Sequence, residues 1–175
     1  MKKEYLLFVL ILVFAQMGQA ADAANISDPH RRGNWQIYGD SPHFLDIGVG
    51  AFDADEKKSA AARVEFRFGK KLFFFGPALG VLASTDDVYF GYGGLYADIA
   101  YRRLVITPLA GVGGYEQGDG RDLGGIFQFR AAISLSYRLG NQYRLGVQAG
   151  HISNAGTHNS NSSEQDLFLT FAIPF

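Results

Sequence analysis

A histidine and a serine two positions apart near the C-terminal end of the chain have the side chains that nucleophilic catalysis requires. His151 and Ser153 belong to the segment His-Ile-Ser-Asn-Ala-Gly at 151–156. A serine hydroxyl is a weak nucleophile until a neighbouring imidazole accepts its proton. Residues two apart on a β-strand share a face and lie about 6–7 Å apart along the strand. On a strand end that bends, the two side chains would form a base–nucleophile couple.

Alternating hydrophobicity predicts that this pair lies on the apolar face of its strand. Leu145, Val147 and Ala149 have the same parity as His151 and Ser153, and alternate strand residues point to opposite faces. Ionisable groups on a lipid-facing surface are costly. Their position at a strand end therefore indicates a task at the membrane surface, on a substrate that lives in the lipid. From the residues alone, an interfacial histidine beside a turn serine is the alternative.

The composition predicts strands and turns as the elements that carry the pair. The 175 residues are 47% hydrophobic and 14% aromatic, with 22 glycines and five prolines. Such a chain is neither disordered nor typical of a helical bundle. The absence of cysteine excludes disulfides, thiol nucleophiles and cysteine-ligated metals. A net charge of -1 does not indicate the basic surface that nucleic-acid binding requires.

The N-terminus has the layout of a secretory signal peptide. Lysines at positions 2 and 3 precede an apolar run at 6–14, and small residues gather over 18–24. A membrane-spanning helix needs about 20 apolar residues, so this run is too short to be one. We expect a signal peptide at 1–20, with cleavage between about 20 and 24. Residues 25–175 are then expected to form a single exported β-barrel domain.

The rest of the chain reads as apolar-rich segments separated by turn residues, after a polar entry segment at 30–41. We predict eight strands, roughly at Phe44–Phe52, Ala61–Phe68, Leu72–Ala83, Val88–Tyr101, Leu104–Gly113, Ile126–Arg138, Tyr143–Ser153 and Leu167–Phe175. Several alternate cleanly, so each has one apolar and one polar face.

Two all-β architectures fit this alternation: a soluble β-sandwich or β-barrel with an apolar interior, and a membrane barrel with an apolar exterior. The segments are long enough for tilted membrane strands of about 9–11 residues. Charged residues on the polar faces can fill a narrow lumen. The chain also ends in an aromatic residue, Phe175, on an amphipathic last strand. These features favour an eight-stranded antiparallel transmembrane β-barrel of the outer-membrane type.

The segment at 151–156, together with a polar loop, acidic residues and the ending Ile173-Pro174-Phe175, resembles the lipid A deacylase family (PagL). The segment at 45–50 also resembles that family's first strand. The resemblance implies an eight-stranded outer-membrane barrel that hydrolyses the ester-linked 3-hydroxyacyl chain at the 3-position of lipid A. It implies Ser153 as nucleophile, His151 as general base and Asn154 as a contributor to the oxyanion hole. It implies no metal and no organic cofactor.

The resemblance does not decide which residue is the acid that orients His151. The family has a glutamate 14 residues after the histidine, and this chain has Gln165 there, flanked by Glu164 and Asp166. A one-residue deletion in the preceding loop would give the role to Glu164, which we expect, and a small insertion would give it to Asp166. Parity instead favours Gln165, which shares a face with the apolar residues of the last strand.

The expected protein is thus a serine esterase of the bacterial outer membrane, with a Ser-His-Glu triad, whose partners are lipid A (lipopolysaccharide) and the surrounding lipids. Two alternatives stay open: a non-catalytic small outer-membrane barrel with a structural or adhesive role, and a soluble periplasmic lipid-binding β-barrel. The His-x-Ser-Asn motif at a lipid-facing strand end argues against the first alternative. Membrane fractionation and heat-modifiable gel mobility would separate out the second.

Overall fold

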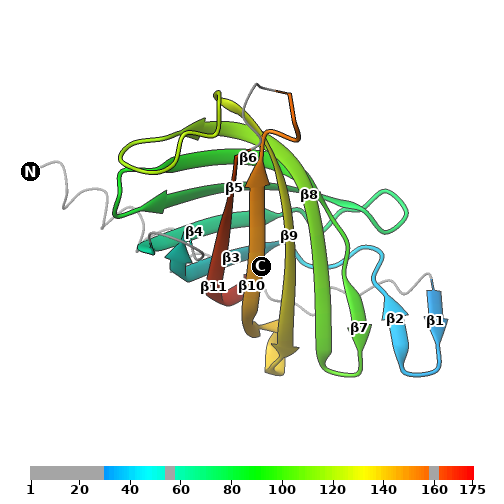
Figure 1. Ribbon diagram of the computed structural model, residues 1–175. Helices are drawn as coiled ribbons and strands as arrows, with labels where there is room; N and C mark the ends of the chain where they lie inside the picture. Colours follow the sequence, from blue (N-terminus) through cyan, green and yellow to red (C-terminus); the bar gives the residue numbers. More distant parts are fainter. Residues whose placement is uncertain (1–29, 54–57, 158–161) are drawn as a thin grey trace, which may run out of the picture.

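The computed structural model describes residues 30–53, 58–157 and 162–175, and this part of the chain is built almost entirely of β-strands (Figure 1). A single 3-10 turn, η1 (Gly140–Gln142), joins two of them. Among the described residues, no helix has the length and apolar character that crossing a bilayer would need. The expected signal peptide at 1–20 lies outside the described residues.

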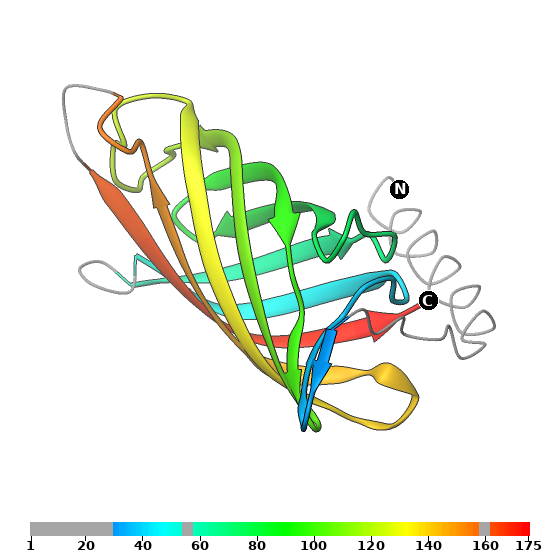
Figure 2. The same cartoon turned by 90° about the vertical axis from the view of Figure 1, so that its right-hand side faces the viewer.

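The strands form a closed antiparallel barrel of eight, as the sequence predicted. The wall consists of β3 (Phe44–Phe52), β4 (Ser59–Arg67), β5 (Gly76–Ser84), β6 (Tyr89–Tyr96), β8 (Leu104–Glu116), β9 (Phe127–Arg138), β10 (Arg144–Ser153) and β11 (Ser163–Pro174). The first wall strand pairs with the last, β3 with β11, and β8 pairs with β9, so the sheet has no open edge in the wall. Figure 2 shows the strands inclined around the barrel.

Three short strands and two shifted boundaries differ from the sequence prediction. The segment expected at Val88–Tyr101 is interrupted after β6, and β7 (Ile99–Tyr101) continues along β8. The polar entry segment contains a hairpin, β1 (His30–Arg32) and β2 (Trp35–Ile37), which pairs with β7.

The segment expected to begin at Leu72 begins only at Gly76, because Leu72 and Phe75 close a tight turn with two mutual backbone hydrogen bonds of 2.9 and 3.0 Å. Phe73, inside that turn, has a φ of 60°. The last strand begins at Ser163, earlier than the expected Leu167.

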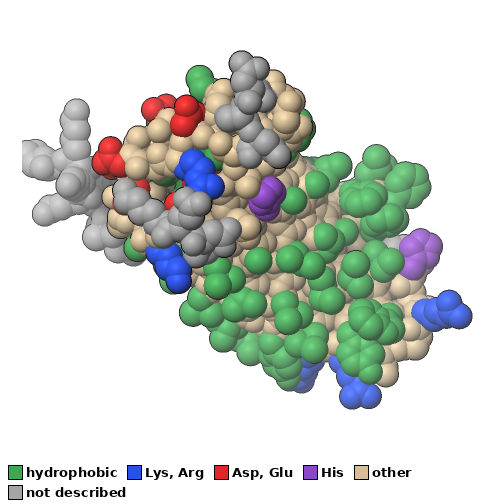
Figure 3. All heavy atoms as spheres, viewed as in Figure 1, with side chains coloured by type: hydrophobic (Ala, Val, Ile, Leu, Met, Phe, Trp, Pro, Cys, Tyr) green, Lys and Arg blue, Asp and Glu red, His purple; other side chains and the backbone are tan. Residues whose placement is uncertain are grey.

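Apolar side chains cover the outside of the wall. On β9, for example, alternate residues from Phe127 to Tyr137, among them Phe129, Ile133 and Leu135, are exposed, while the residues between these alternate positions are buried. Figure 3 shows the resulting apolar band across the strands, with acidic side chains gathered at the upper end. A surface of this kind faces hydrocarbon in membrane barrels.

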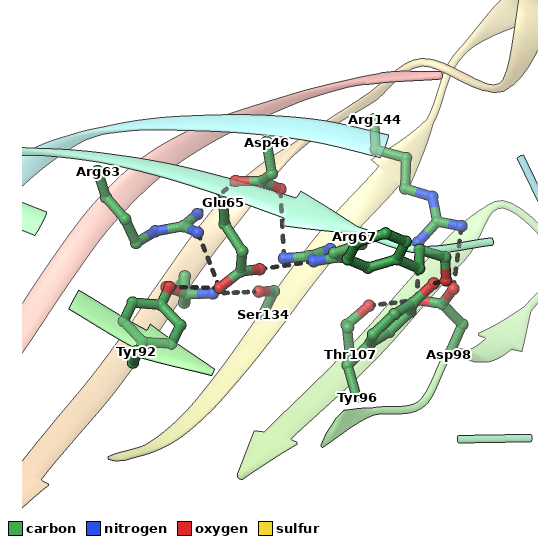
Figure 4. A network of polar contacts seen from close by, with 12 residues as sticks. Asp46, Arg63, Glu65, Arg67, Tyr92, Tyr96, Asp98, Thr107, Ser134 and Arg144 are labelled. Atoms are coloured by element: carbon green, nitrogen blue, oxygen red, sulfur yellow. Dashed lines mark hydrogen bonds and ion pairs between the residues drawn. The ribbon is translucent and has the colours of Figure 1, made fainter. Parts of the chain in front are cut away.

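Paired charges fill the lumen (Figure 4). The Glu65 carboxylate accepts a hydrogen bond of 2.7 Å from Arg67 Nε and one from the Tyr92 hydroxyl. Arg63 contacts both Glu65 and Asp46. Buried charges are costly unless they are paired, and each of these charged side chains forms an ion pair with a side chain of opposite charge in the cluster.

A second cluster of charges lies nearer the C-terminal end of the barrel. Asp98, which interrupts the β6–β7 strand, binds Arg144 Nη1 at 2.8 Å and Lys71 Nζ at 3.1 Å, and accepts a hydrogen bond from Thr107 Oγ1 at 2.7 Å. The polar residues that alternate along the strands thus face a packed interior of paired charges.

Candidate active site

His151 and Ser153 lie on the outside of the barrel, at the end of β10 that is opposite to the C-terminus. His151 is exposed and Ser153 is half-buried, whereas Ile152 between them is buried in the interior. Leu145, Val147 and Ala149 are exposed on the same face, as the parity of the sequence predicted. No hydrogen bond links the His151 imidazole to the Ser153 hydroxyl within the described part of the chain, and such contacts are often looser in substrate-free enzymes.

The register of the sheet sets the neighbours of His151. His151 lies directly opposite Gln165 on β11 and directly opposite Ala131 on β9. Directly opposite residues on antiparallel strands share a face, with Cβ atoms about 4.5–5.5 Å apart. The Gln165 side chain is exposed on the outer face, so it is within reach of the imidazole. The small Ala131 leaves the other side of the imidazole open.

Glu164 and Asp166 point the other way, into the barrel. Glu164 is 1% exposed, with its carboxylate 3.3 Å from Arg121 Nε. Asp166 is 2% exposed and forms an ion pair of 2.6 Å with Arg130. Neither carboxylate is on the side of the wall where His151 lies. The expectation that Glu164, or after an insertion Asp166, orients His151 therefore does not agree with their placement.

The reason for this difference is the early start of β11. The polar run Ser163-Glu164-Gln165-Asp166 resembles a loop in the sequence, because lumen-facing carboxylates interrupt the apolar pattern. In the fold both carboxylates meet arginines inside the barrel. The run therefore continues the strand, and strand parity decides which of its side chains faces outwards.

Asn154 also faces the interior, and it shapes the turn that follows β10. Its side chain is fully buried, and its Nδ2 donates a hydrogen bond of 2.9 Å to the carbonyl oxygen of Leu123. Its Oδ1 accepts 2.9 Å from the Gly156 N–H, and its carbonyl oxygen accepts 3.0 Å from the Thr157 N–H. Ala155 and Gly156 both have positive φ, 50° and 75°. Asn154 thus fixes a tight turn directly after Ser153.

The connection between β8 and β9 supports this turn from the inside. Leu123, in that connection, is buried, and its carbonyl oxygen accepts a hydrogen bond from Asn154 and a longer one, of 3.4 Å, from Gln128 Nε2. Gln128 also donates 2.6 Å to the carbonyl oxygen of Gly125. Nothing in the spacing of Leu123 and Gln128 connects them to Asn154, so the sequence gives no indication that they support the site.

A shallow apolar groove lies beside the site on the outer surface. Its volume is about 290 Å³, and it is lined by Ile106, Ile133, Ser134, Leu135, Val147, Ala149 and Leu167. Ala149 precedes His151 by two residues on the same face of β10, which corresponds to about 6–7 Å along the strand. Ala149 lies directly opposite Ile133 and Leu167 in the sheet. The groove therefore lies in the apolar band on the face of β10 that carries His151, and its nearest lining residue on that strand is two positions from His151.

Within residues 30–53, 58–157 and 162–175, no three histidine or carboxylate side chains converge as metal ligands. The site consists of an imidazole, a hydroxyl and an amide on a lipid-facing surface. Nucleophilic cleavage of an acyl bond uses a hydroxyl nucleophile, an imidazole base and a donor for the oxyanion.

The fold and the position of these residues define a class of protein, the eight-stranded outer-membrane β-barrel with polar side chains at one margin of its apolar outer surface. The family model described as "Lipid A 3-O-deacylase (PagL)" matches residues 14–174. The chain belongs to this family, and both its family and its fold imply the outer membrane.

A solved structure has the same fold. It is titled "Crystal structure of the outer membrane enzyme PagL" and matches with a TM-score of 0.60 and 19% sequence identity, over 75% of this chain and 99% of the other. None of the curated proteins matches the sequence.

Proposed function

We propose that the protein hydrolyses the ester that links a 3-hydroxyacyl chain to the 3-position of lipid A. The observation that carries the proposal is the pair His151 and Ser153 on the lipid-facing side of β10, in a chain of the lipid A 3-O-deacylase family. A membrane lipid brings its ester to this surface without leaving the bilayer. The adjacent groove is apolar and open to the surroundings, which suits an acyl chain.

In the first half-reaction, Ser153 Oγ attacks the ester carbonyl carbon while the His151 imidazole takes the hydroxyl proton. The tetrahedral intermediate then collapses, the bond to the sugar oxygen breaks, and the imidazolium returns its proton to that oxygen. The deacylated lipid leaves, and Ser153 carries the acyl group. In the second half-reaction, His151 takes a proton from a water molecule that attacks the acyl-serine carbonyl. The bond to Ser153 Oγ then breaks, the imidazolium returns its proton to Oγ, and the fatty acid is released.

We assign the oxyanion to the backbone of the turn after Ser153 rather than to the Asn154 side chain. That side chain is engaged with Leu123 and Gly156. The Gly156 N–H donates to Asn154 Oδ1, so the Ala155 N–H is the donor that we propose. One well-placed donor of this kind is worth about 3–4 kcal/mol in the transition state.

We assign the orienting role to Gln165. As the cross-strand neighbour of His151, its amide oxygen is a suitable acceptor for the imidazole N–H that faces away from Ser153. A neutral amide fixes the ring but does not balance the positive charge that the imidazolium carries in the transition state. We therefore expect the reaction to be slower than with a carboxylate at this position.

The test is mass spectrometry of lipid A from cells that express the chain or its Ser153→Ala variant. Loss of one hydroxyacyl chain with the parent, and not with the variant, supports the proposal. Unchanged lipid A with both, at equal amounts of heat-modifiable barrel and also after detergent solubilisation, rejects it. That second result would favour a non-catalytic barrel, for which the replacement of the family's glutamate by Gln165 is the supporting observation.

A further inference from the structure

The β1–β2 hairpin extends the wall of the barrel sideways by two strands. The sheet order runs β1-β2-β7-β8, so the hairpin continues the sheet beyond the point where the barrel closes (Figure 1). Trp35 on β2 lies opposite Tyr101, Tyr101 opposite Leu104, and Leu104 opposite Tyr137 on β9. The same row continues through Leu145 to Phe171 of β11. The hairpin is therefore at the C-terminal end of the barrel, far from His151.

The outer face of the hairpin continues the lipid-facing surface. Trp35 is 50% exposed, and its ring centroid is 5.0 Å from that of Tyr101. Tyr101 and Tyr137, in the same row, are also exposed. Tryptophan and tyrosine at this level form the aromatic belt that lies among the lipid headgroups in membrane barrels. The row therefore carries the belt out onto the hairpin.

Four exposed arginines lie in the two segments that carry Trp35 and Tyr101 or adjoin them. Arg31 and Arg32 belong to β1, and Arg102 and Arg103 form the turn between β7 and β8. The Arg102 guanidinium is 5.8 Å from the centre of the Tyr101 ring. The Arg102 backbone N–H donates 3.2 Å to the carbonyl oxygen of Asn34 in the hairpin turn. This hydrogen bond holds the two turns together, so the two pairs of arginines belong to adjacent segments at the same end of the barrel.

The acidic groups at this end are engaged elsewhere. Asp98 is buried between Arg144 and Lys71. Asp40 accepts a hydrogen bond of 2.9 Å from the Lys71 N–H and forms an ion pair with Lys70, contacts that hold the pKa of its carboxyl below the usual range. Within the described part of the chain, no carboxylate forms an ion pair with any of the four arginines. Their charge is available to an external anion.

We propose that the β1–β2 hairpin and the β7–β8 turn bind the phosphate headgroup of an anionic phospholipid, in the leaflet at the C-terminal end of the barrel. Guanidinium groups match the geometry of phosphate and bind it through paired hydrogen bonds. The aromatic row sets the depth of the hairpin at the headgroup level, where Arg32 shares the face of Trp35. The charge of the arginines selects anionic over zwitterionic lipid. This site uses no residue of the proposed active site.

Trp35 makes the proposal directly testable, because it is the only tryptophan of the chain. The folded barrel is reconstituted in phosphatidylcholine vesicles that contain the same mole fraction of either brominated phosphatidylglycerol or brominated phosphatidylcholine. Bromine quenches only a tryptophan that is near the labelled lipid. We expect phosphatidylglycerol to quench Trp35 about twofold more strongly at low salt, and the difference to shrink at high salt, because salt screens exposed charges.

The decisive comparison uses the variant in which Arg31, Arg32, Arg102 and Arg103 are all replaced by glutamine. We expect this variant to lose the preference for the anionic lipid and to keep the quenching by brominated phosphatidylcholine, which reports that the hairpin is still in the membrane. Lys70→Gln, at the same end but outside the hairpin, is the matched control and keeps the preference. Equal quenching by both lipids in the parent, or a preference that survives in the arginine variant, would overturn the proposal. Absence of quenching by either lipid would also overturn it.

Discussion

His151 and Gln165 are direct cross-strand partners of β10 and β11, and both side chains face the outside of the barrel. The two residues beside Gln165 face the interior and are held there by arginines. The cross-strand neighbour of the imidazole on this surface is therefore an amide, although two carboxylates are adjacent in the sequence.

Replacing Gln165 by glutamate is predicted to raise the deacylation rate. A carboxylate orients the imidazole and also balances the charge of the imidazolium. In serine proteases, replacing the triad carboxylate by an amide lowers kcat roughly 10⁴-fold. We expect the opposite exchange here to recover part of that factor and to raise kcat by about tenfold or more. The measurement is the rate of hydroxyacyl release from purified lipid A in detergent. Glu164→Gln, one residue away but inside the barrel, is the control and should leave kcat within about twofold. A slower Gln165→Glu enzyme would exclude the assigned role.

Asn154→Ala is predicted to lower both stability and activity. The substitution removes the buried donor to the Leu123 carbonyl and the acceptor for the Gly156 N–H. We expect the free energy of unfolding to fall by about 1–3 kcal/mol, measured by urea unfolding in detergent, and kcat to fall because the turn that holds the Ala155 N–H loosens. Asn141→Ala, in the exposed turn at the other end of the barrel, tests whether the loss of activity is specific. The same loss of kcat in both variants would argue against an oxyanion turn after Ser153.

Ala149→Phe is predicted to fill the apolar groove beside His151. Ala149 is on the outer face and lines the groove, so a larger side chain should exclude an acyl chain with little effect on the barrel. We expect KM to rise for substrates with long acyl chains and to change little for short ones. Val49→Phe, exposed on the outer face of β3, is the matched change outside the groove. An equal effect on long and short chains would show that the groove does not hold the acyl chain.

Asp166→Asn is predicted to affect stability rather than chemistry. The ion pair with Arg130 is completely buried, so removing one partner leaves an uncompensated charge in the lumen. We expect a loss of about 3–5 kcal/mol in the free energy of unfolding. Gln165→Asn, the neighbouring position on the outer face, should change the stability by less than about 0.5 kcal/mol. Urea titration of the two variants compares them directly, and equal stability would contradict the interior placement of Asp166.

The period-two pattern of the sequence determined much of the architecture. Alternating side chains predicted eight wall strands with an apolar outside, and they predicted that His151 lies outside with Leu145 and Val147. These predictions agree with the structure because the face of a side chain in a strand depends only on its parity, which the sequence alone contains.

Only the tertiary structure decided what each polar side chain meets. The sequence could not show that Glu164 and Asp166 find arginines in the lumen, or that Asn154 binds the Leu123 carbonyl, since these contacts join strands that are far apart in the chain. It also gave no sign of the β1–β2 hairpin, whose strands are too short to display a period. The pairing register between strands places Gln165 opposite His151, and residue order does not give this register. The register is fixed because every strand must turn its interior-facing side chains to the same side of the sheet.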